Sequence, residues 1–271
     1  MNRLAQCALV AMVLLSACGP ASTPPGTPIP ALPGWELVWH DEFDADAIDT
    51  ANWTYDIGAG GWGNGEAQYY TSRPENARIE TGMLVIEARQ EKYEESYYTS
   101  ARLKTQGLQS FQYGRIEARL KVSAGDGLWP AFWMLGSSFD GTNWPDCGEI
   151  DIMEYVGREP DLIIGTLHGP GYSGALGVSQ WNRQEYAIAE DFHTYAIEWQ
   201  PGQIDWYYDG DKYHTVTPAD LSGRQWVFDQ PFFIILNLAM GGTLGGAIGL
   251  DTVFPAQYAV DYVRVYQAAD S

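Results

Sequence analysis

Cysteine is scarce in this 271-residue chain. It occurs at positions 7, 18 and 147 only, and the first two positions fall in an N-terminal segment with the features of an export signal. The domain that remains after export would hold Cys147 alone, which excludes a disulfide framework despite the export. Stability must therefore come from a hydrophobic core, with or without a bound metal.

Basic residues are also few. The chain has 15 Lys and Arg against 35 Asp and Glu, a formal net charge of −20. This charge argues against nucleic acid and anionic lipid as partners, whereas a neutral ligand is not repelled. Aromatic residues are abundant, with 11 Trp, 17 Tyr and 9 Phe. Aromatic rings are the usual platforms for the faces of sugars, although such residues also fill the core of many β-sandwiches.

Long helical stretches are missing, and one turn at 218–223 is the only helical segment that we expect. Short runs rich in β-branched and aromatic residues recur instead, many alternating with period two between Gly, Pro, Asn or Asp. We expect strands at 35–43, 83–89, 113–122, 131–136, 149–156, 162–169, 193–200, 204–210, 231–240 and 259–267. This pattern predicts an all-β fold, a sandwich of two packed antiparallel sheets of the β-jelly-roll kind, with one domain at 34–271.

The N-terminal segment has the pattern of an export signal. Residues 1–17 contain a short basic region, an apolar run and small residues before Cys18. The sequence LSAC resembles a lipobox, which predicts a lipid anchor on Cys18, whereas the alternative is ordinary signal cleavage nearby. Residues 18–33 are rich in Pro, Gly, Ser and Thr and are expected to act as a semi-rigid linker. We therefore expect an exported, membrane-anchored lipoprotein at the cell surface, or otherwise a secreted protein.

Three carboxylates lie close together in GEIDIMEYVG, residues 148–157. In a regular strand Glu149 and Asp151 share one face, and the isoleucines between them enter the core. Glu154 lies five positions after Glu149 and would point to the opposite face. One extra residue in a β-bulge near Met153 would return Glu154 to the face of the other two. The spacing therefore predicts a bulge, a feature that is common beside active sites.

With this bulge, Glu149 and Glu154 are four strand steps apart, roughly 13 Å between Cα atoms. Side chains that lean together can narrow the gap to about 5 or 6 Å, the separation of retaining glycosidases. Asp151 between them would orient one glutamate, and repulsion should raise the pKa of at least one carboxyl. A calcium site and an exposed acidic face are the alternatives.

The stretch resembles glycoside hydrolase family 16, in its bacterial laminarinase-like branch of endo-β-1,3-glucanases, whose motif is E-x-D-x-x-E. The resemblance covers about 230 residues and includes GWGNGEAQYYT, NARIETGMLVIEAR, ARLKTQG, YGRIEARLKVSAGDGLWPAFWMLG, WPDCGEIDIMEYVG, GTLHG, FFIILNLAMGG and VDYVRVYQ. It implies a β-jelly-roll sandwich of two curved antiparallel sheets, concanavalin A-like, with an open glucan-binding cleft on a concave sheet face. It also implies that Glu149 is the nucleophile, Glu154 the acid and base, and Asp151 the assisting carboxylate.

The resemblance assigns further residues to the cleft. Trp129 and Trp133, four apart on one strand face, and Trp144 resemble the family's sugar-stacking residues, with core packing as the alternative. His168, in GTLHG, resembles the histidine beside the catalytic carboxylates, and the alternative is a structural histidine.

Three polar residues complete this set of expected substrate contacts. Asn64, Arg102 and Asn237 match family positions that bond sugar hydroxyls. Arg102 can instead pair with a surface carboxylate. Leu244 stands where many relatives carry Trp, so we expect a barer cleft wall and a weaker subsite there.

The family resemblance also implies a structural calcium ion on the convex side. Asp261 is the expected side-chain ligand, with Glu42 and Gly82 supplying backbone carbonyls. The two-glutamate mechanism itself needs no cofactor.

The leading hypothesis is a retaining endo-β-1,3-glucanase that acts on laminarin-type glucans, with mixed-linkage β-1,3/1,4-glucan as a further substrate. We expect it to act as a monomer on a polysaccharide. One alternative is a hydrolase or transglycosylase of the same fold acting on another β-glycan. A different class is a glucan-binding, lectin-like protein without catalysis, against which both glutamates argue.

Overall fold

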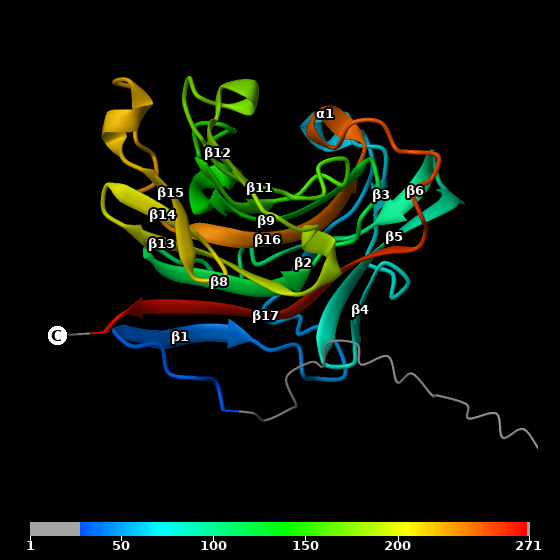
Figure 1. Ribbon diagram of the computed structural model, residues 1–271, viewed down its shortest axis with the longest axis horizontal. Helices are drawn as coiled ribbons and strands as arrows, with labels where there is room; N and C mark the ends of the chain where they lie inside the picture. Colours follow the sequence, from blue (N-terminus) through cyan, green and yellow to red (C-terminus); the bar gives the residue numbers. More distant parts are fainter. Residues whose placement is uncertain (1–27, 270–271) are drawn as a thin grey trace, which may run out of the picture.

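Two stacked, curved β-sheets form the part of the chain that the computed structural model describes, residues 28–269 (Figure 1). The predicted signal segment 1–17, Cys18 and most of the linker lie outside these residues. Nearly all strand pairs are antiparallel; the short β3 and β6 form a parallel pair. The prediction of an all-β jelly-roll sandwich is confirmed.

The larger sheet has ten strands in the order β15-β14-β13-β8-β17-β5-β6-β3, with β1 paired to β17 and β4 paired to β5. Its strands are β1 (Trp35–Asp41), β3 (Tyr69–Tyr70), β4 (Ala77–Glu80), β5 (Met83–Tyr93), β6 (Ser96–Ser100), β8 (Gly114–Lys121), β13 (His193–Gln200), β14 (Gln203–Tyr208), β15 (Asp211–Val216) and β17 (Ala256–Ala268).

The smaller sheet has seven strands in the order β12-β11-β10-β9-β16-β7-β2. They are β2 (Thr54–Asp56), β7 (Arg102–Lys104), β9 (Leu128–Gly136), β10 (Glu149–Glu154), β11 (Leu162–His168), β12 (Val178–Arg183) and β16 (Phe232–Met240). The strand with the three carboxylates, β10, therefore lies inside this sheet, two strands from the β12 edge.

Helical segments are short. They are η1 (Gly61–Gly63), η2 (Ser137–Asp140), η3 (Gly174–Leu176), η4 (Ile188–Glu190), η5 (Pro218–Leu221) and α1 (Gly242–Gly245). The expected turn near 218 is η5, which starts with a capping box between Thr217 and Asp220. Among residues 28–269, no helix is both long enough and apolar enough to span a membrane.

The hydrophobic core lies between the two sheets, as the period-two pattern predicts. On β8, Ile116, Ala118 and Leu120 are fully buried in it, and Val122 continues the same face. All ten expected strands are present. The strands that the sequence pattern missed are short or lie at or near sheet edges, where apolar alternation is weak: β2, β3, β4, β6, β7, β12 and β15.

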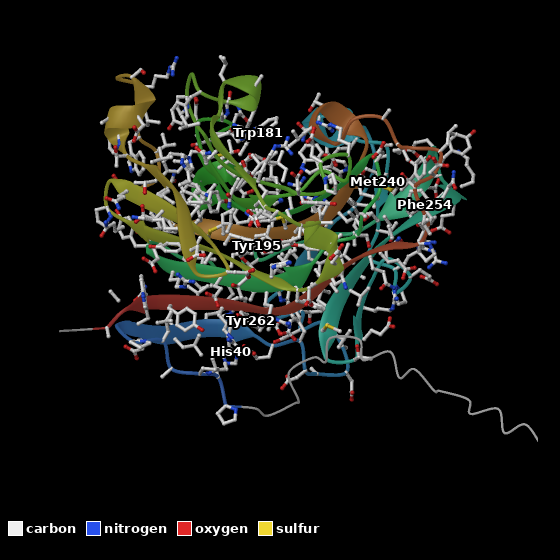
Figure 2. All side chains as sticks on the ribbon, in the orientation of Figure 1. His40, Trp181, Tyr195, Met240, Phe254 and Tyr262 are labelled. Atoms are coloured by element: carbon white, nitrogen blue, oxygen red, sulfur yellow. The ribbon has the colours of Figure 1, made fainter. Side chains whose placement is uncertain are left out.

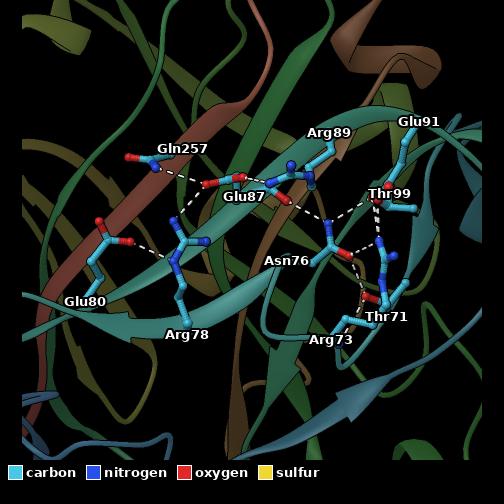
Figure 3. Close-up of polar contacts among 10 residues, drawn as sticks. All are labelled: Thr71, Arg73, Asn76, Arg78, Glu80, Glu87, Arg89, Glu91, Thr99 and Gln257. Carbon is cyan, nitrogen blue, oxygen red and sulfur yellow. Dashed lines mark hydrogen bonds and ion pairs between the residues drawn. The ribbon is translucent and has the colours of Figure 1, made fainter.

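A polar network ties β4, β5 and β6 together at one end of the larger sheet (Figure 3). At its centre Glu87, which is almost fully buried, accepts hydrogen bonds from Arg78 at 2.8 Å and from Gln257 at 3.1 Å. Arg89 also contacts this carboxylate, and Asn76 donates to the Glu87 carbonyl at 3.0 Å. Burial raises the pKa of Glu87, but these bonds and charges outweigh it and lower the pKa below its ordinary value.

Candidate active site

The predicted bulge is present in β10. Asp151 pairs with Trp133 on β9, and Glu154 pairs with Ala131, so a step of three residues on β10 faces a step of two on β9. The register shifts between Asp151 and Met153, and it shifts over the same stretch against β11. The position near Met153 is confirmed, and the extra residue corrects the parity of the strand.

The bulge separates the carboxylates from the aliphatic residues of β10. Ile150 and Ile152 are buried in the core between the sheets, and Met153 joins them. Glu149 and Glu154 instead line a cleft of about 400 Å³ on the outer face of the smaller sheet, with Asp151 between them.

The bulge is held from the opposite sheet. The indole Nε1 of Trp206, on β14, donates to the backbone carbonyl of Asp151 at 2.8 Å. Gly165 on β11 leaves room for this ring, because a Cβ at that position would lie 2.7 Å from Trp206 Cδ1. A bulge disturbs the ladder of backbone hydrogen bonds between strands. The Trp206 indole, a buried donor from the other sheet, therefore gives the Asp151 carbonyl a hydrogen-bond partner at the bulge.

Each glutamate accepts a hydrogen bond from its own tryptophan. Trp144 Nε1 donates to Glu149 Oε2 at 2.7 Å, and Trp129 Nε1 donates to Glu154 Oε1 at 3.1 Å. Trp144 is 42% exposed, so its ring faces solvent at the cleft. Trp129 is 8% exposed and packs in a small cluster outside the main core, together with Leu244. These contacts fix the rotamers of both glutamates.

His168 lies beside the carboxylates. Its Nε2 is 3.2 Å from Asp151 Oδ2 and 3.9 Å from Glu149 Oε1. The register explains this position, because His168 on β11 pairs directly with Glu149 on β10. The imidazole therefore lies near both Asp151 and Glu149, and Asp151 can hold a proton or a charge for its neighbours.

All three carboxyl groups have raised pKa values. Burial is the main cause for each of them, and repulsion within the group adds to it for Glu149 and Glu154. The pKa of Glu149 rises to about 8, held down by the His168 and Arg102 charges and by the Trp144 hydrogen bond. The pKa of Glu154 rises well above its ordinary value. The expected rise occurs, but its main cause is burial rather than the repulsion that the spacing suggested.

The other expected substrate contacts also line this cleft. Trp133 Nε1 donates to Asn237 Oδ1 at 2.7 Å, which orients its ring. Arg102 lies over the Trp133 ring, 4.7 Å from its centroid, and forms an ion pair with Asp56 at 2.9 Å. Arg102 is therefore paired with a carboxylate, which was the alternative to a sugar contact, but this carboxylate, Asp56, also lines the cleft. Asn64 is part of the same wall.

Several residues that line the cleft were not predicted from the sequence, Glu66 among them, and neither was the buried Tyr70. Glu66 accepts hydrogen bonds from Asn64 at 3.1 Å and from Tyr70 at 3.0 Å. Tyr70 accepts one from Asn237 at 3.1 Å, so a chain of bonds runs from Glu66 to the amide that holds Trp133. Both residues belong to the stretch GWGNGEAQYYT. The polar and aromatic residues among its glycines were the sequence feature that could have indicated them.

Two carboxylates and one imidazole of this site also lie close enough together to bind a metal ion. Glu149, Asp151 and His168 each offer one ligand atom, all within 4.8 Å of one another. A calcium ion, the metal considered from the sequence, prefers oxygen ligands only. The imidazole and the Trp144 N–H that already donates to Glu149 make this cluster a poor calcium site.

The residues expected to hold a structural calcium ion lie at one junction of the larger sheet, where β1 ends and β5 begins beside the middle of β17. Asp261 on β17 directly follows Val260, which pairs with Leu84 of β5, and Leu84 is two positions after Gly82. Glu42 directly follows β1, which pairs with β17.

The side chains at this junction already have cationic partners. The Asp261 carboxylate is 2% exposed and accepts from Arg119 at 2.8 Å. Glu42 accepts two bonds from Arg264, at 3.0 and 2.8 Å, so only its backbone carbonyl suits the expected role. One buried carboxylate with backbone carbonyls is an oxygen donor set that fits calcium.

Leu244 lies in α1 and packs against Trp129, Val156 and Ala239. Trp129 and Ala239 line the cleft, so Leu244 packs against the cleft wall. The weaker subsite expected at this position remains a prediction.

Comparison with known proteins gives one consistent family. Residues 62–264 match the profile of the family described as glycosyl hydrolases family 16. A beta-glucanase of Rhodothermus marinus is 50% identical over 246 residues, covering 87% of this chain and 86% of that protein. The solved structure of an endo-beta-1,3-glucanase from Pyrococcus furiosus has a TM-score of 0.85 at 48% identity, covering 88% of this chain and 96% of the other.

A further solved structure is described as a non-specific endo-beta-1,3(4)-glucanase from family GH16, with 1,3-beta-D-cellobiosyl-glucose at its active site. Its TM-score is 0.78 at 40% identity, and the match covers 89% of this chain and 98% of that chain.

Proposed function

The chain belongs to glycosyl hydrolase family 16, and we propose that it is a retaining endo-β-1,3-glucanase that cuts internal linkages of laminarin-type glucans and also accepts mixed-linkage β-1,3/1,4-glucan. One observation carries this proposal. The bulge in β10 turns Glu149, Asp151 and Glu154 to the same face, in a cleft walled by tryptophans. Two carboxylates with a third between them suit glycoside hydrolysis.

The mechanism follows from the positions of the two glutamates. Glu154 donates its proton to the leaving glycosidic oxygen while the Glu149 carboxylate attacks the anomeric carbon, which forms a covalent glycosyl-enzyme. Glu154, now ionised, takes a proton from a water molecule. The resulting hydroxide attacks the same carbon and releases Glu149. Two inversions at one carbon give net retention of configuration.

The pKa values support this division of roles. The pKa of Glu154 lies well above its ordinary value, so Glu154 keeps its proton at neutral pH and can act as an acid. Glu149 ionises more readily, because the Trp144 N–H and the nearby positive groups lower its pKa against the effect of burial. Asp151 is close enough to accept or share the proton that Glu149 must lose.

The substrate assignment is tested by measuring reducing ends released from laminarin, lichenan, agarose and xyloglucan. We expect laminarin to be cut fastest and lichenan more slowly. A preference for agarose or xyloglucan would contradict the assignment and favour another activity of the same fold. Binding of laminarin without any cleavage would identify a glucan-binding protein instead.

The nucleophile is tested with Glu149→Ala. We expect this variant to lose laminarin hydrolysis and to regain glycosyl transfer when supplied with an α-laminaribiosyl fluoride donor, because the fluoride mimics the glycosyl-enzyme. Hydrolysis near the parent rate would show that Glu149 is not the nucleophile.

A calcium ion at the junction of Asp261, Glu42 and Gly82 is the second part of the proposal. Its role would be structural, because this junction lies on the larger sheet and the cleft is on the smaller one. The buried carboxylate and the backbone carbonyls of two adjacent strand ends would supply its oxygen ligands.

Export and a lipid anchor on Cys18 form the third part of the proposal. The described chain enters the domain at β1, which lies on the larger sheet, opposite the sheet that carries the cleft (Figure 1). A linker that reaches this side would leave the cleft open to a polysaccharide. Labelling with palmitate in a bacterial host should mark the parent protein and not Cys18→Ser, and an unlabelled parent would contradict the anchor.

A further inference from the structure

An exposed tryptophan lies on the cleft face of the smaller sheet, outside the walled cleft. Trp181 is on the edge strand β12 and is 54% exposed. Figure 2 shows it on the side of the smaller sheet that faces away from the larger one. No motif pointed to this residue, and the cleft wall described above comes from β10 and the strands on its other side.

The strand registers show that Trp181 shares a face with the catalytic carboxylates. It pairs with Ile164 on β11, and Ile164 pairs with Glu154 on β10. Directly paired residues of antiparallel strands point to the same side of a sheet. Gly165, next to Ile164, faces the core and meets Trp206 there, which confirms the orientation of β11.

This pairing forms one row across the sheet, perpendicular to the strands. From β12 to β7 the row contains Trp181, Ile164, Glu154, Ala131, Asn237 and Arg102. Trp181 is two strands from Glu154, about 10 Å at the usual strand spacing. Within this row, the expected sugar contacts Asn237 and Arg102 lie on one side of Glu154, and Trp181 is the aromatic residue on the other side.

The neighbours of Trp181 on the same face are polar. Ser179 accepts a hydrogen bond from Thr166 at 3.0 Å, and Arg183 is held by Glu159 and Asp161, both at 2.7 Å. An apolar ring between hydroxyl and charged groups suits a pyranose, whose C–H face packs on the ring while its hydroxyls meet polar partners. Ile164, between Trp181 and Glu154 in this row, is buried and uncharged.

We propose that Trp181 is a stacking platform for a remote glucosyl unit of the substrate, on the β12 side of the scissile bond. An endo-acting enzyme must hold the chain on both sides of the bond that it cuts, and no residue of β11 or β12 lines the walled cleft. A chain that crosses the strands along this row passes from Arg102 over Glu154 to Trp181. This inference rests on the proposed glucanase activity and extends its binding site by one subsite.

The test compares Trp181→Ala with the parent on laminarin oligosaccharides of increasing length. In the parent, kcat/KM should rise with each added unit that gains a contact. In Trp181→Ala the rise should stop before the longest substrates, with a loss of about fivefold to tenfold on laminariheptaose, the range expected for one stacked ring. The shortest substrate that is cut should show no change, because it does not reach β12.

Two further variants separate binding from structure. Trp181→Phe keeps an aromatic face and should recover most of the lost kcat/KM. Tyr97→Ala removes another exposed aromatic side chain, on β6 of the larger sheet, and should leave the length dependence unchanged. Equal unfolding midpoints of Trp181→Ala and the parent would exclude a folding defect as the cause.

The outcomes distinguish this inference from the function on which it rests. If the parent does not cut laminarin, the proposed function fails. If the parent cuts laminarin and Trp181→Ala has the same length dependence, the function stands and the platform is wrong. A uniform loss on short and long substrates alike would also contradict a remote subsite.

Discussion

The Trp206 indole donates to the Asp151 carbonyl across the interior of the sandwich, at 2.8 Å. Trp206 belongs to the larger sheet and Asp151 to the catalytic strand of the smaller one, so this bond joins the two layers at the bulge. The bulge is what brings Glu154 to the face of Glu149. The position of the acid therefore depends on a buried residue that does not itself face the cleft.

Trp206→Phe changes the size of the side chain only modestly, but it should lower activity strongly. The change keeps most of the ring but removes the N–H, which leaves the Asp151 carbonyl without this partner. We expect a loss of about 1–3 kcal/mol in the free energy of unfolding and a fall in kcat on laminarin of about tenfold, because the acid is displaced. Urea unfolding and initial rates measure the two effects.

Trp199→Phe is the matched control. Trp199 is also buried, lies on the neighbouring strand β13, and donates to a backbone carbonyl, that of Phe228, at 3.0 Å. We expect a similar loss of stability with kcat nearly unchanged. An equal fall in kcat in both variants would show that Trp206 acts through general stability and not through the bulge.

His168→Asn should shift the acid side of the pH profile. The charge of His168 lowers the pKa of Glu149 against burial. Without that charge the nucleophile stays protonated to a higher pH, so the rising limb of kcat/KM should move upward by about half a pH unit or more. A limb that stays in place, with only a uniform drop in rate, would mean that His168 does not tune Glu149.

Glu154→Gln should make the protein more stable at alkaline pH. Burial raises the pKa of Glu154 well above its ordinary value of 4.5, so above that value the folded protein holds a proton that the unfolded chain has lost. Stability therefore falls as pH rises from about 4.5 towards the folded pKa. A neutral glutamine removes this cost, and we expect a gain on the order of 1–2 kcal/mol at pH 8 that vanishes near pH 4.

Glu87→Gln provides a control of opposite sign. The bonds and charges of Arg78, Arg89 and Gln257 outweigh burial and lower the pKa of Glu87, so its contribution to stability is present above the ordinary value and is lost as pH falls through the folded pKa. This variant should be less stable than the parent at pH 7, and the difference should shrink in acid. Denaturant unfolding at pH 4 and pH 8 tests both variants, and a shared pH trend would contradict the assigned environments.

Removal of calcium should lower the melting temperature without changing the mechanism. A chelator should reduce the melting temperature of the parent by several degrees, and added calcium should restore it, because an ion bound only to the folded state stabilises that state. Asp261→Asn should lose the response to calcium. If the chelator does not change the melting temperature of the parent, the predicted metal site is wrong. The Arg119 ion pair would then balance the charge of Asp261 without a metal ion.

The sequence predicts the catalytic strand well because its information is local. The alternation of acids and isoleucines sets the two faces of β10, and the spacing of Glu154 requires a change of parity. Both conclusions need only the period of a β-strand. The family resemblance then supplies roles for residues that the spacing leaves open.

Contacts between strands that are distant in the sequence could not be predicted from local sequence patterns. Trp206 lies 55 residues from Asp151, and nothing in its own stretch indicates that it supports a bulge in the other sheet. Strand β12 was missed because it lies at an edge and is mostly exposed, so its sequence VSQWNR has no clear apolar alternation. Its register, which places Trp181 on the catalytic face, appears only when the strands are paired.

The anomeric configuration of the first product tests the central claim most directly. Laminarin hydrolysis by the parent enzyme can be followed by proton NMR at early times, before mutarotation mixes the anomers. Two glutamates that act as nucleophile and acid in turn predict that the β-anomer appears first. Initial release of the α-anomer would mean inversion by direct attack of water, and it would contradict the roles assigned to Glu149 and Glu154.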